Sequence, residues 1–265
     1  MPKPMDITSL QNPRVKYFVK LREDKKQRRQ DGLMLVEGFD EIALALSAGY
    51  KPHTLLAAPE LATRQIDFSA AENISVTRAV FEKISYRDNP DGWLAIFPIP
   101  KISLDDLKLS PSPLIVVAES VEKPGNLGAI LRTADAARVD ALIVCDARTD
   151  IYNPNVVRAS RGTLFTVPTV EASNQDALSF LRRNGTRILA ASPQADSLYT
   201  TQDLRGPLAL AVGSEDEGLT DFWLGRADVK VKIPMTGKVN SLNVSIAAAL
   251  IIYEAVRQRT SSVSK

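Results

Sequence analysis

The chain has 265 residues, which is enough for two domains of ordinary size or for one large α/β domain. Hydrophobic residues make up 45% and charged residues 24%, the composition of a soluble globular protein with a buried core, and this excludes overall disorder. One cysteine, Cys145, excludes an internal disulfide, and one histidine, His53, leaves no Cys/His cluster for zinc, so no metal is expected. His53 lies in a short apolar run, where a structural histidine is a better interpretation than a member of a Ser-His triad.

Charge is unevenly distributed along the chain, although the net charge is only +2. Eight basic residues and only two acidic ones occur from position 14 to position 29; the basic ones are Arg14, Lys16, Lys20, Arg22, Lys25, Lys26, Arg28 and Arg29. Such a run is more often a solvated helix face than a binding site. No run of about 18 apolar residues and no apolar leader occurs, so we expect a cytoplasmic protein without a membrane partner.

The first hundred residues predict a small α/β domain, residues 1–98. Asn12-Pro13 opens a helix whose apolar stripe is Val15, Phe18 and Leu21. Further elements follow in chain order: a strand at Leu33 to Val36, a helix at Phe39 to Ser47 ended by Gly49, strands at His53 to Ala58, Ile74 to Thr77 and Trp93 to Phe97, and a helix at Arg78 to Ile84. Proline-rich, weakly periodic residues 99–113 then predict a linker.

Residues 114–265 predict a second α/β domain. Strand-like runs alternate with helical stretches at Leu114 to Ala118, Ala141 to Cys145, Leu164 to Val167, Arg187 to Ala190, Leu208 to Val212 and Val229 to Ile233. These runs are apolar throughout, which is typical of a mostly parallel sheet with helices on both faces. The final helix, Asn243 to Arg259, is apolar nearly all round, so it is buried within the subunit or against a second copy.

Three polar loops follow predicted strands, where open α/β sheets bind ligands. The first carries Asn126, as a helix cap, and Arg132. The second, Gly213 to Thr220, holds three consecutive carboxylates, which disfavour a phosphate ligand and suit a cationic or neutral one. The third, Ile233 to Ser245, contains Gly237-Lys238 but lacks the other residues of a phosphate-binding loop, and no GxGxxG opens the first helix of the sheet.

At these loops the sequence resembles the SpoU, or TrmH-type, RNA 2'-O-methyltransferases of the SPOUT superfamily. The segments that carry the resemblance are Pro124-Gly-Asn-Leu-Gly-Ala-Ile-Leu-Arg-Thr-Ala-Asp135, Gly213-Ser-Glu-Asp-Glu-Gly218 and Ile233-Pro-Met through Ser241-Leu-Asn-Val-Ser245. The resemblance implies a deep trefoil knot, a homodimer and S-adenosyl-L-methionine as cofactor. It also implies that residues 1–98 are a ribosomal-protein-like, RNA substrate-binding domain.

The resemblance further implies which residues form the site. Gly213, Ile233 and Leu242 match the cofactor contacts, and the catalytic positions are Asn126, Arg132, Glu215, Ser241 and Asn243. We expect Arg132 to hold the target nucleotide and stabilise the developing alkoxide, because a guanidinium rarely gives up a proton. Glu215 either accepts the proton or, as we prefer, fixes Arg132 or the loop backbone.

Structured RNA is the expected partner, with ribosomal RNA favoured over transfer RNA. The residues expected to contact RNA phosphates are Arg14, Lys25, Lys26, Arg28, Arg29, Arg158 and Arg161. Two other functions remain open: a catalytically silent RNA-binding protein with the same fold, which the intact site residues disfavour, and a nucleotide-binding oxidoreductase, which the missing dinucleotide motif disfavours.

Overall fold

The computed structural model describes residues 5–66, 70 and 72–261. The chain divides into two compact units. The N-terminal unit is Met1–Lys101 with Asp150–Thr166, and the C-terminal unit is Ile102–Thr149 with Val167–Lys265. In the part of the chain that the structure describes, no helix is both long and apolar enough to cross a membrane.

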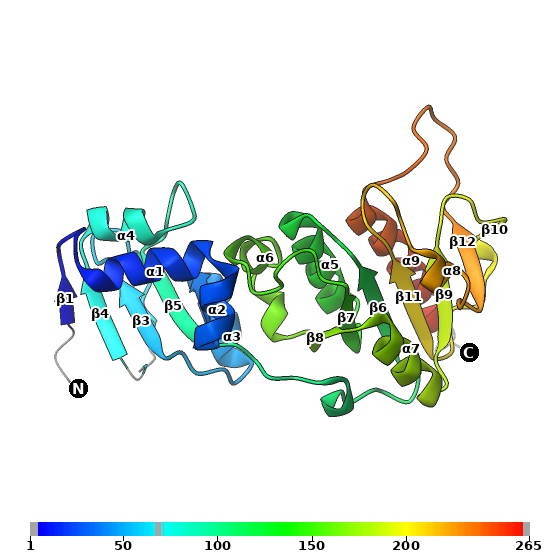
Figure 1. The fold of residues 1–265 in the computed structure, drawn as a ribbon, viewed down its shortest axis with the longest axis horizontal. Coiled ribbons are helices and arrows are strands. Elements are labelled where there is room, and N and C mark those ends of the chain that lie inside the picture. Colours follow the sequence, from blue (N-terminus) through cyan, green and yellow to red (C-terminus); the bar gives the residue numbers. More distant parts are fainter. Residues whose placement is uncertain (1–4, 67–69, 71, 262–265) are drawn as a thin grey trace. The chain divides into compact units, whose positions relative to one another are not determined.

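The N-terminal unit is built on a five-stranded mixed sheet in the order β1-β4-β3-β5-β2 (Figure 1). Strands β1, β4 and β3 are parallel, while β5 runs antiparallel to both β3 and β2. The strands are β1 (Met5–Ile7), β2 (Leu33–Glu37), β3 (Thr54–Ala57), β4 (Glu72–Val76) and β5 (Trp93–Pro98). The four strands predicted for residues 1–98 are therefore present, and β1 is an additional one.

Helices α1 (Pro13–Glu23) and α4 (Arg78–Ile84) cover one face of this sheet, where Val15, Phe18 and Leu21 are buried as predicted. The Asn12 side chain caps α1 by accepting a hydrogen bond from the backbone N–H of Arg14 at 2.9 Å. The basic run is not one continuous helix, because Asp24 is extended and caps a second helix, α2 (Lys25–Asp31).

The other face of the N-terminal sheet packs against α3 (Phe39–Ser47) and against residues 150–166. This segment contains α6 (Pro154–Ala159) and the 3-10 helix η2 (Thr163–Phe165). The Phe165 ring lies 5.0 Å from that of Tyr50 and 5.3 Å from that of Phe97. The predicted strand at Leu164 to Val167 is therefore wrong, and residues 150–166, which the sequence pattern assigns to the C-terminal domain, belong to the N-terminal unit.

The C-terminal unit contains a seven-stranded, fully parallel sheet in the order β10-β12-β9-β11-β6-β7-β8. Its central strands are buried along their whole length. The strands are β6 (Leu114–Glu119), β7 (Ala141–Cys145), β8 (Thr169–Ala172), β9 (Arg187–Ala191), β10 (Ser197–Leu198), β11 (Leu208–Val212) and β12 (Val229–Lys232). The predicted mostly parallel sheet is thus confirmed.

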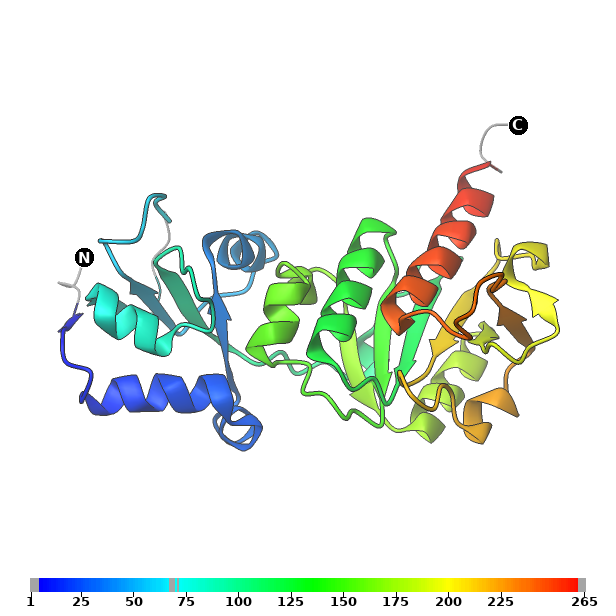
Figure 2. The same ribbon diagram turned by 90° about the horizontal axis from the view of Figure 1, so that it is seen from above.

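Helices lie on both faces of this sheet. Helices α7 (Asn174–Arg183) and α8 (Asp221–Leu224) share one core with the strands, while α5 (Pro124–Ala136) and α9 (Val244–Ser261) pack against each other on the opposite face (Figure 2). The remaining 3-10 helices are η1 (Leu104–Asp106) and η3 (Tyr199–Thr201). Part of the predicted linker is anchored here, because Leu104, Leu107 and Leu109 pack against the α7/α8 core.

Candidate cofactor pocket and active site

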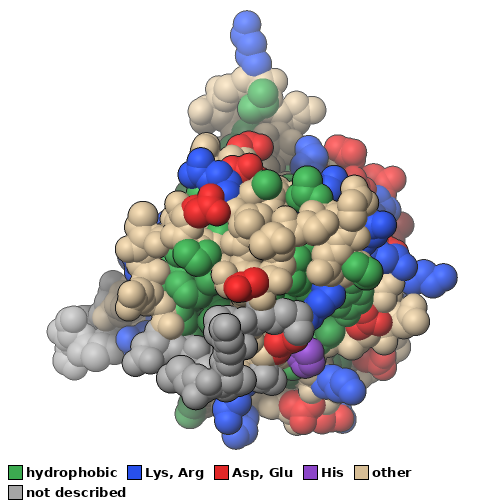
Figure 3. All heavy atoms as spheres, turned by 90° about the vertical axis from the view of Figure 1, so that its left-hand side faces the viewer, with side chains coloured by type: hydrophobic (Ala, Val, Ile, Leu, Met, Phe, Trp, Pro, Cys, Tyr) green, Lys and Arg blue, Asp and Glu red, His purple; other side chains and the backbone are tan. Residues whose placement is uncertain are grey.

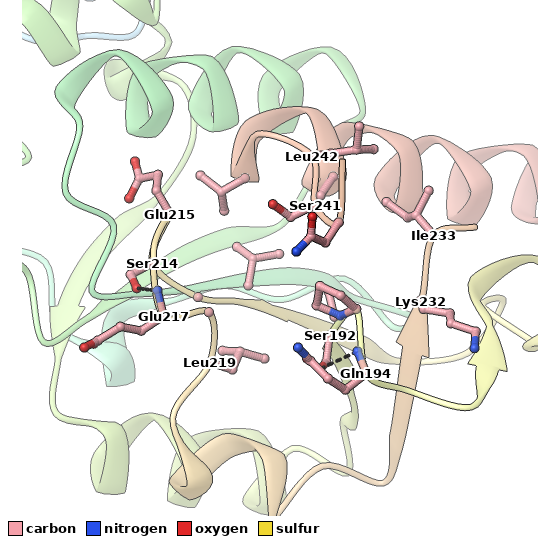
Figure 4. A pocket seen from close by; sticks show the side chains of 18 of the residues that line it. Ser192, Gln194, Ser214, Glu215, Glu217, Leu219, Lys232, Ile233, Ser241 and Leu242 are labelled. Carbon is pink, nitrogen blue, oxygen red and sulfur yellow. Dashed lines mark hydrogen bonds between the residues drawn. The ribbon is translucent and has the colours of Figure 1, made fainter. Parts of the chain in front are cut away.

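A pocket of about 340 Å³ opens at the carboxyl ends of β9, β11 and β12 in the C-terminal unit (Figure 4). It is bounded by the segments that follow these three strands and by the first turns of α9. Its lining includes all three predicted cofactor residues, Gly213, Ile233 and Leu242, together with Glu215 and Ser241. The expectation that ligands bind at the carboxyl ends of the strands therefore located the pocket correctly.

One wall of the pocket was not anticipated from the sequence. Ser192, Pro193 and Gln194, directly after β9, line it opposite the loop after β11. The Ser192 hydroxyl donates a hydrogen bond to the side-chain oxygen of Gln194 at 2.8 Å. The sequence could have indicated this wall, because the tripeptide follows an apolar strand and so lies at the same edge of the sheet as the other loops.

The loop after β11 folds back on itself at the pocket. Ser214 and Gly218 exchange backbone hydrogen bonds of 3.0 and 3.1 Å, and Gly218 has a φ of +73°. A Cβ on Gly213 would lie 1.9 Å from the carbonyl carbon of Gly218. Glycine is therefore required at position 213, and the loop turns its backbone as well as its side chains toward the pocket.

The Glu215 carboxylate lies at the start of α5. It accepts hydrogen bonds from the backbone N–H groups of Glu122 at 3.1 Å and Lys123 at 3.2 Å, and from the side-chain amide of Asn126. Burial raises the pKa of Glu215, but the hydrogen bonds from Glu122, Asn126 and Lys123 outweigh it, so the pKa lies below its ordinary value. These contacts support the role of fixing the loop backbone and make Glu215 a poor proton acceptor.

Asn126 and Asn243 join the first and third loops. The Asn243 side-chain amide donates to the side-chain oxygen of Asn126 at 3.0 Å. The Asn243 side-chain oxygen accepts hydrogen bonds from the backbone N–H of Ser245 at 2.9 Å and from its hydroxyl at 2.6 Å. The predicted cap role of Asn126 is wrong, because Lys123 is the cap residue and Asn126 lies in the first turn of α5.

Arg132 and Ser241 are the two predicted catalytic residues outside this hydrogen-bond chain. Arg132 is exposed on α5, six residues after Asn126 and so about 9 Å further along the helix axis. Among residues 5–66, 70 and 72–261 it has no hydrogen-bond or ion-pair partner, so Glu215 does not hold it. Ser241 is exposed on the pocket lining.

A buried carboxylate, Glu119, supports the loop after β11 and was missed by sequence reasoning. This fully buried side chain accepts hydrogen bonds from the backbone N–H and the hydroxyl of Thr220, both at 2.8 Å, and from the Asn174 amide at 2.9 Å. Asn174 in turn accepts a 2.7 Å hydrogen bond from the Trp223 indole. The network ties the end of the loop after β11 to β6. Its only signal in the sequence was a charge at the end of an apolar strand.

Arg28 and Arg14, both predicted to contact RNA, are at least half-buried and paired with carboxylates of the N-terminal unit. Arg28 is only 1% exposed; its Nε and Nη2 donate to Asp150 at 2.8 and 2.6 Å, and its Nη1 donates to the carbonyl of Leu21 at 2.7 Å. The prediction that Arg28 contacts RNA is therefore wrong. Arg14 is half-buried and holds the Glu72 carboxylate through both terminal nitrogens.

The other predicted RNA-contacting residues remain accessible. Lys26 and Arg29 are exposed and Lys25 is half-buried, and all three line a shallow depression on α2. Arg158 and Arg161 are exposed on the segment that covers the N-terminal sheet, although Arg161 makes an exposed ion pair with Asp40 at 3.4 Å. On the face drawn in Figure 3, basic and acidic side chains are interspersed.

Comparison with known proteins places this geometry in a family. Residues 113–253 match the SpoU rRNA Methylase family, and residues 12–95 match the MRM3-like substrate binding domain. The 23S rRNA (uridine(2479)-2'-O)-methyltransferase of Streptomyces viridochromogenes is 32% identical over 96% of this chain and 93% of its own length.

Solved structures match nearly the full length of the chain. A crystal structure of an RNA 2'-O ribose methyltransferase has a TM-score of 0.86 and 41% identity, covering 97% of this chain and 100% of that one. An AdoMet-bound rRNA methyltransferase from Sinorhizobium meliloti has a TM-score of 0.86 and 32% identity, covering 95% of this chain and 97% of that one. The chain therefore belongs to the SpoU (TrmH-type) methyltransferases of the SPOUT superfamily.

Proposed function

We propose that this protein transfers a methyl group from S-adenosyl-L-methionine to a ribose 2'-hydroxyl of ribosomal RNA in the cytoplasm. The observation that carries the proposal is the meeting of three loops at one pocket. Gly213, Ile233 and Leu242 line that pocket, and the Glu215–Asn126–Asn243 hydrogen-bond chain joins the same loops. Full-length similarity to an AdoMet-bound rRNA methyltransferase supports the choice of cofactor and RNA.

The residues of the pocket fit the proposed cofactor. Leu219, Ile233 and Leu242 offer apolar surface for an adenine ring, and the turn at Gly213 offers backbone groups for its polar edge. The carboxylates of Asp216 and Glu217 on the same lining favour a cation over an anion. When bound, the cofactor supplies a methyl group on a positively charged sulfur.

The chain itself has to orient the ribose and stabilise charge on its 2'-oxygen. The planar guanidinium of Arg132 is free to bind the target phosphate or ribose through two N–H groups at once. Arg132 is carried on α5, whose first turn is fixed by Glu215 and Asn126. A guanidinium beside the 2'-oxygen stabilises the negative charge that develops there. Ser241 lies on the pocket lining, and Asn243 orders the start of α9.

We propose a homodimer that buries one face of α9. Ile246, Leu250 and Tyr253, at spacings of four and three residues, form an apolar stripe that is 52%, 39% and 49% exposed. An exposed stripe of this kind marks an interface, and it begins just after Asn243.

We also propose that the loops around the pocket are threaded as a deep trefoil knot.

We propose that RNA phosphates are contacted by Lys25, Lys26 and Arg29 on α2, by Arg158 and Arg161, and by the accessible part of Arg14. Exposed arginine and lysine side chains bind phosphates with a strong dependence on salt concentration. Neutralising Lys26 and Arg29 together should weaken RNA binding and reduce its salt dependence. The buried Arg28 is no longer part of this set.

The experiment that tests the function combines calorimetry with mapping of 2'-O-methyl groups. The wild-type protein should bind S-adenosyl-L-methionine and methylate unmodified 23S rRNA, whereas Arg132→Ala should bind the cofactor normally and lose turnover. Arg132→Lys should also be strongly impaired, because an ammonium lacks the guanidinium fork. Methylation of transfer RNA alone, or NAD binding without S-adenosyl-L-methionine binding, would contradict the proposal.

A further inference from the structure

A short loop of the N-terminal unit presents an aromatic side chain to solvent. Tyr86 lies in the segment 85–92 between α4 and β5, and 43% of it is exposed. Its hydroxyl has no hydrogen-bond partner in the described part of the chain. The phosphate contacts proposed above leave this residue without a role.

The loop is held rigidly beneath Tyr86 by a buried carboxylate. Glu37, at the end of β2, is 6% exposed and accepts hydrogen bonds from the Ser85 hydroxyl at 2.5 Å and from the backbone N–H of Tyr86 at 2.7 Å. Burial raises the pKa of Glu37, and the hydrogen bonds from Ser85 and Tyr86 offset this only in part. A charge placed in the interior to fix one loop indicates that the loop's position matters.

The next residue, Arg87, also holds this loop in place, but one of its buried N–H groups has no hydrogen-bond partner among the described residues. Its Nη2 donates to the Glu37 carbonyl at 3.0 Å and lies 2.8 Å from the buried Glu41 carboxylate. Its buried Nε has no hydrogen-bond partner within the described residues. Gly38 has a φ of +111°, and a Cβ there would lie 2.2 Å from Glu41 Oε2. A buried donor without a partner among these residues and a backbone conformation open only to glycine show that this segment is tightly constrained.

A guanidinium lies over one face of the exposed ring and leaves the opposite face for a base. The Arg158 Cζ atom lies 5.6 Å from the centroid of the Tyr86 ring, and its Nη2 donates to the Asn155 side-chain oxygen at 2.9 Å. Arg158 is itself exposed, and Arg161 lies three residues further on. An aromatic face beside arginine is the arrangement with which proteins bind unpaired nucleotides, because the ring stacks on a base while the cation contacts phosphate or base.

We propose that Tyr86 and Arg158 form a stacking site for one unpaired nucleobase of the RNA substrate. The proposal rests on the proposed function and names the part of the RNA that the N-terminal unit recognises: a base in a loop or bulge, rather than a duplex. Sequence-specific recognition of RNA uses such unstacked bases. The fixed loop reduces the entropy cost of holding the ring in place.

The test uses the full-length protein and two fluorescently labelled probes of equal length, an oligouridylate of twelve nucleotides and an abasic oligomer with the same phosphates. The variants are Tyr86→Ala, Tyr86→Phe and Arg158→Ala. Leu10→Ala and Arg78→Ala serve as controls, because Leu10 is similarly exposed in the same unit and Arg78 is an exposed arginine of that unit. Affinities are measured at several salt concentrations.

Tyr86→Ala should weaken oligouridylate binding about tenfold without changing its salt dependence, and should not affect the abasic oligomer. Tyr86→Phe should bind as the wild type does, and Arg158→Ala should reduce both affinity and salt dependence. Equal losses on both probes, or none with Tyr86→Ala, would overturn the proposal.

A fluorescent base analogue in the oligonucleotide gives a readout that does not depend on the alanine variant being folded. Binding to the wild type and to Tyr86→Phe should quench the analogue, and binding to Tyr86→Leu should not. Equal quenching by Tyr86→Leu would also overturn the proposal. Failure of the methyltransferase function would appear separately, as absence of cofactor binding and of 2'-O-methyl marks with the wild-type protein.

Discussion

The side-chain amide of Asn243 donates a hydrogen bond to the side chain of Asn126, which lies 117 positions earlier in the chain. Asn126 in turn donates to Glu215, so one chain of polar contacts connects the loops after β6, β11 and β12. Because helix α5 carries both Asn126 and Arg132, these contacts fix the helix that presents the guanidinium.

Removing either asparagine should therefore slow methyl transfer more than it weakens cofactor binding. We expect Asn126→Ala and Asn243→Ala each to lower kcat/KM about 10- to 100-fold, because small misplacements of reacting groups cost this much. The double variant should be less impaired than the product of the single effects, since both break one network. Steady-state kinetics and cofactor calorimetry on the four proteins measure this, and fully additive effects would show that the contact is incidental.

Replacing Glu215 by glutamine tests its role as an ionised clamp. A glutamine has only one acceptor oxygen, so it leaves at least one of the N–H groups of Glu122 and Lys123 without its side-chain acceptor. Because these groups are not buried, we expect a loss of about 0.5–1.5 kcal/mol in the free energy of unfolding at pH 7.

The pH dependence of that loss follows from the lowered pKa of Glu215 in the folded state. The carboxylate's contribution is fully present above its ordinary pKa of 4.5 and is lost as the pH falls through the lower folded-state value. Denaturant unfolding of both proteins between pH 3 and pH 7 should therefore show the stability difference shrinking at low pH. A constant difference across this range would contradict the clamp.

The position of the pocket was predictable because its lining comes from local motifs that follow strands. The family resemblance singled out Gly213, Ile233 and Leu242, and these residues meet in one pocket because each follows the carboxyl end of a parallel strand. The Glu119 network could not be assigned, because Thr220 and Asn174 are distant in sequence and a single charge after an apolar strand does not identify its partners.

The errors in the predicted fold have a similar cause. The apolar run at Leu164 to Val167 is too short to distinguish a strand from a helical turn, and in the structure Phe165 packs against Tyr50 and Phe97 instead of entering the sheet. The assignment of Arg28 to an RNA surface failed because its partner, Asp150, lies 122 positions away.

Arg28 and Asp150 should control stability and not RNA affinity. Arg28→Met leaves the buried Asp150 carboxylate unpaired, so we expect a loss of about 3–5 kcal/mol in the free energy of unfolding. The double variant Arg28→Met/Asp150→Leu should recover part of this loss, because both charges are then removed.

The matched comparison for this pair is the exposed Lys26→Gln/Arg29→Gln variant. It should unfold like the wild type while binding RNA more weakly, with a smaller dependence on salt concentration. Thermal melts and binding titrations separate the two sets of residues. If Arg28→Met/Asp150→Leu is stable yet loses RNA affinity as Lys26→Gln/Arg29→Gln does, Arg28 has a role in RNA binding that its burial argues against.

The apolar stripe on α9 predicts how the protein assembles. Leu250→Glu/Tyr253→Glu should convert a dimer into monomers, because two carboxylates cannot be buried unpaired at an interface. The monomer should remain folded, since 39% of Leu250 and 49% of Tyr253 are already exposed within one protomer. Leu198→Glu is the control, because Leu198 is a comparably exposed apolar residue on β10 of the same unit, away from the stripe. Sedimentation velocity measures the assembly, and a wild-type monomer, or a double variant that stays dimeric, would rule out this interface.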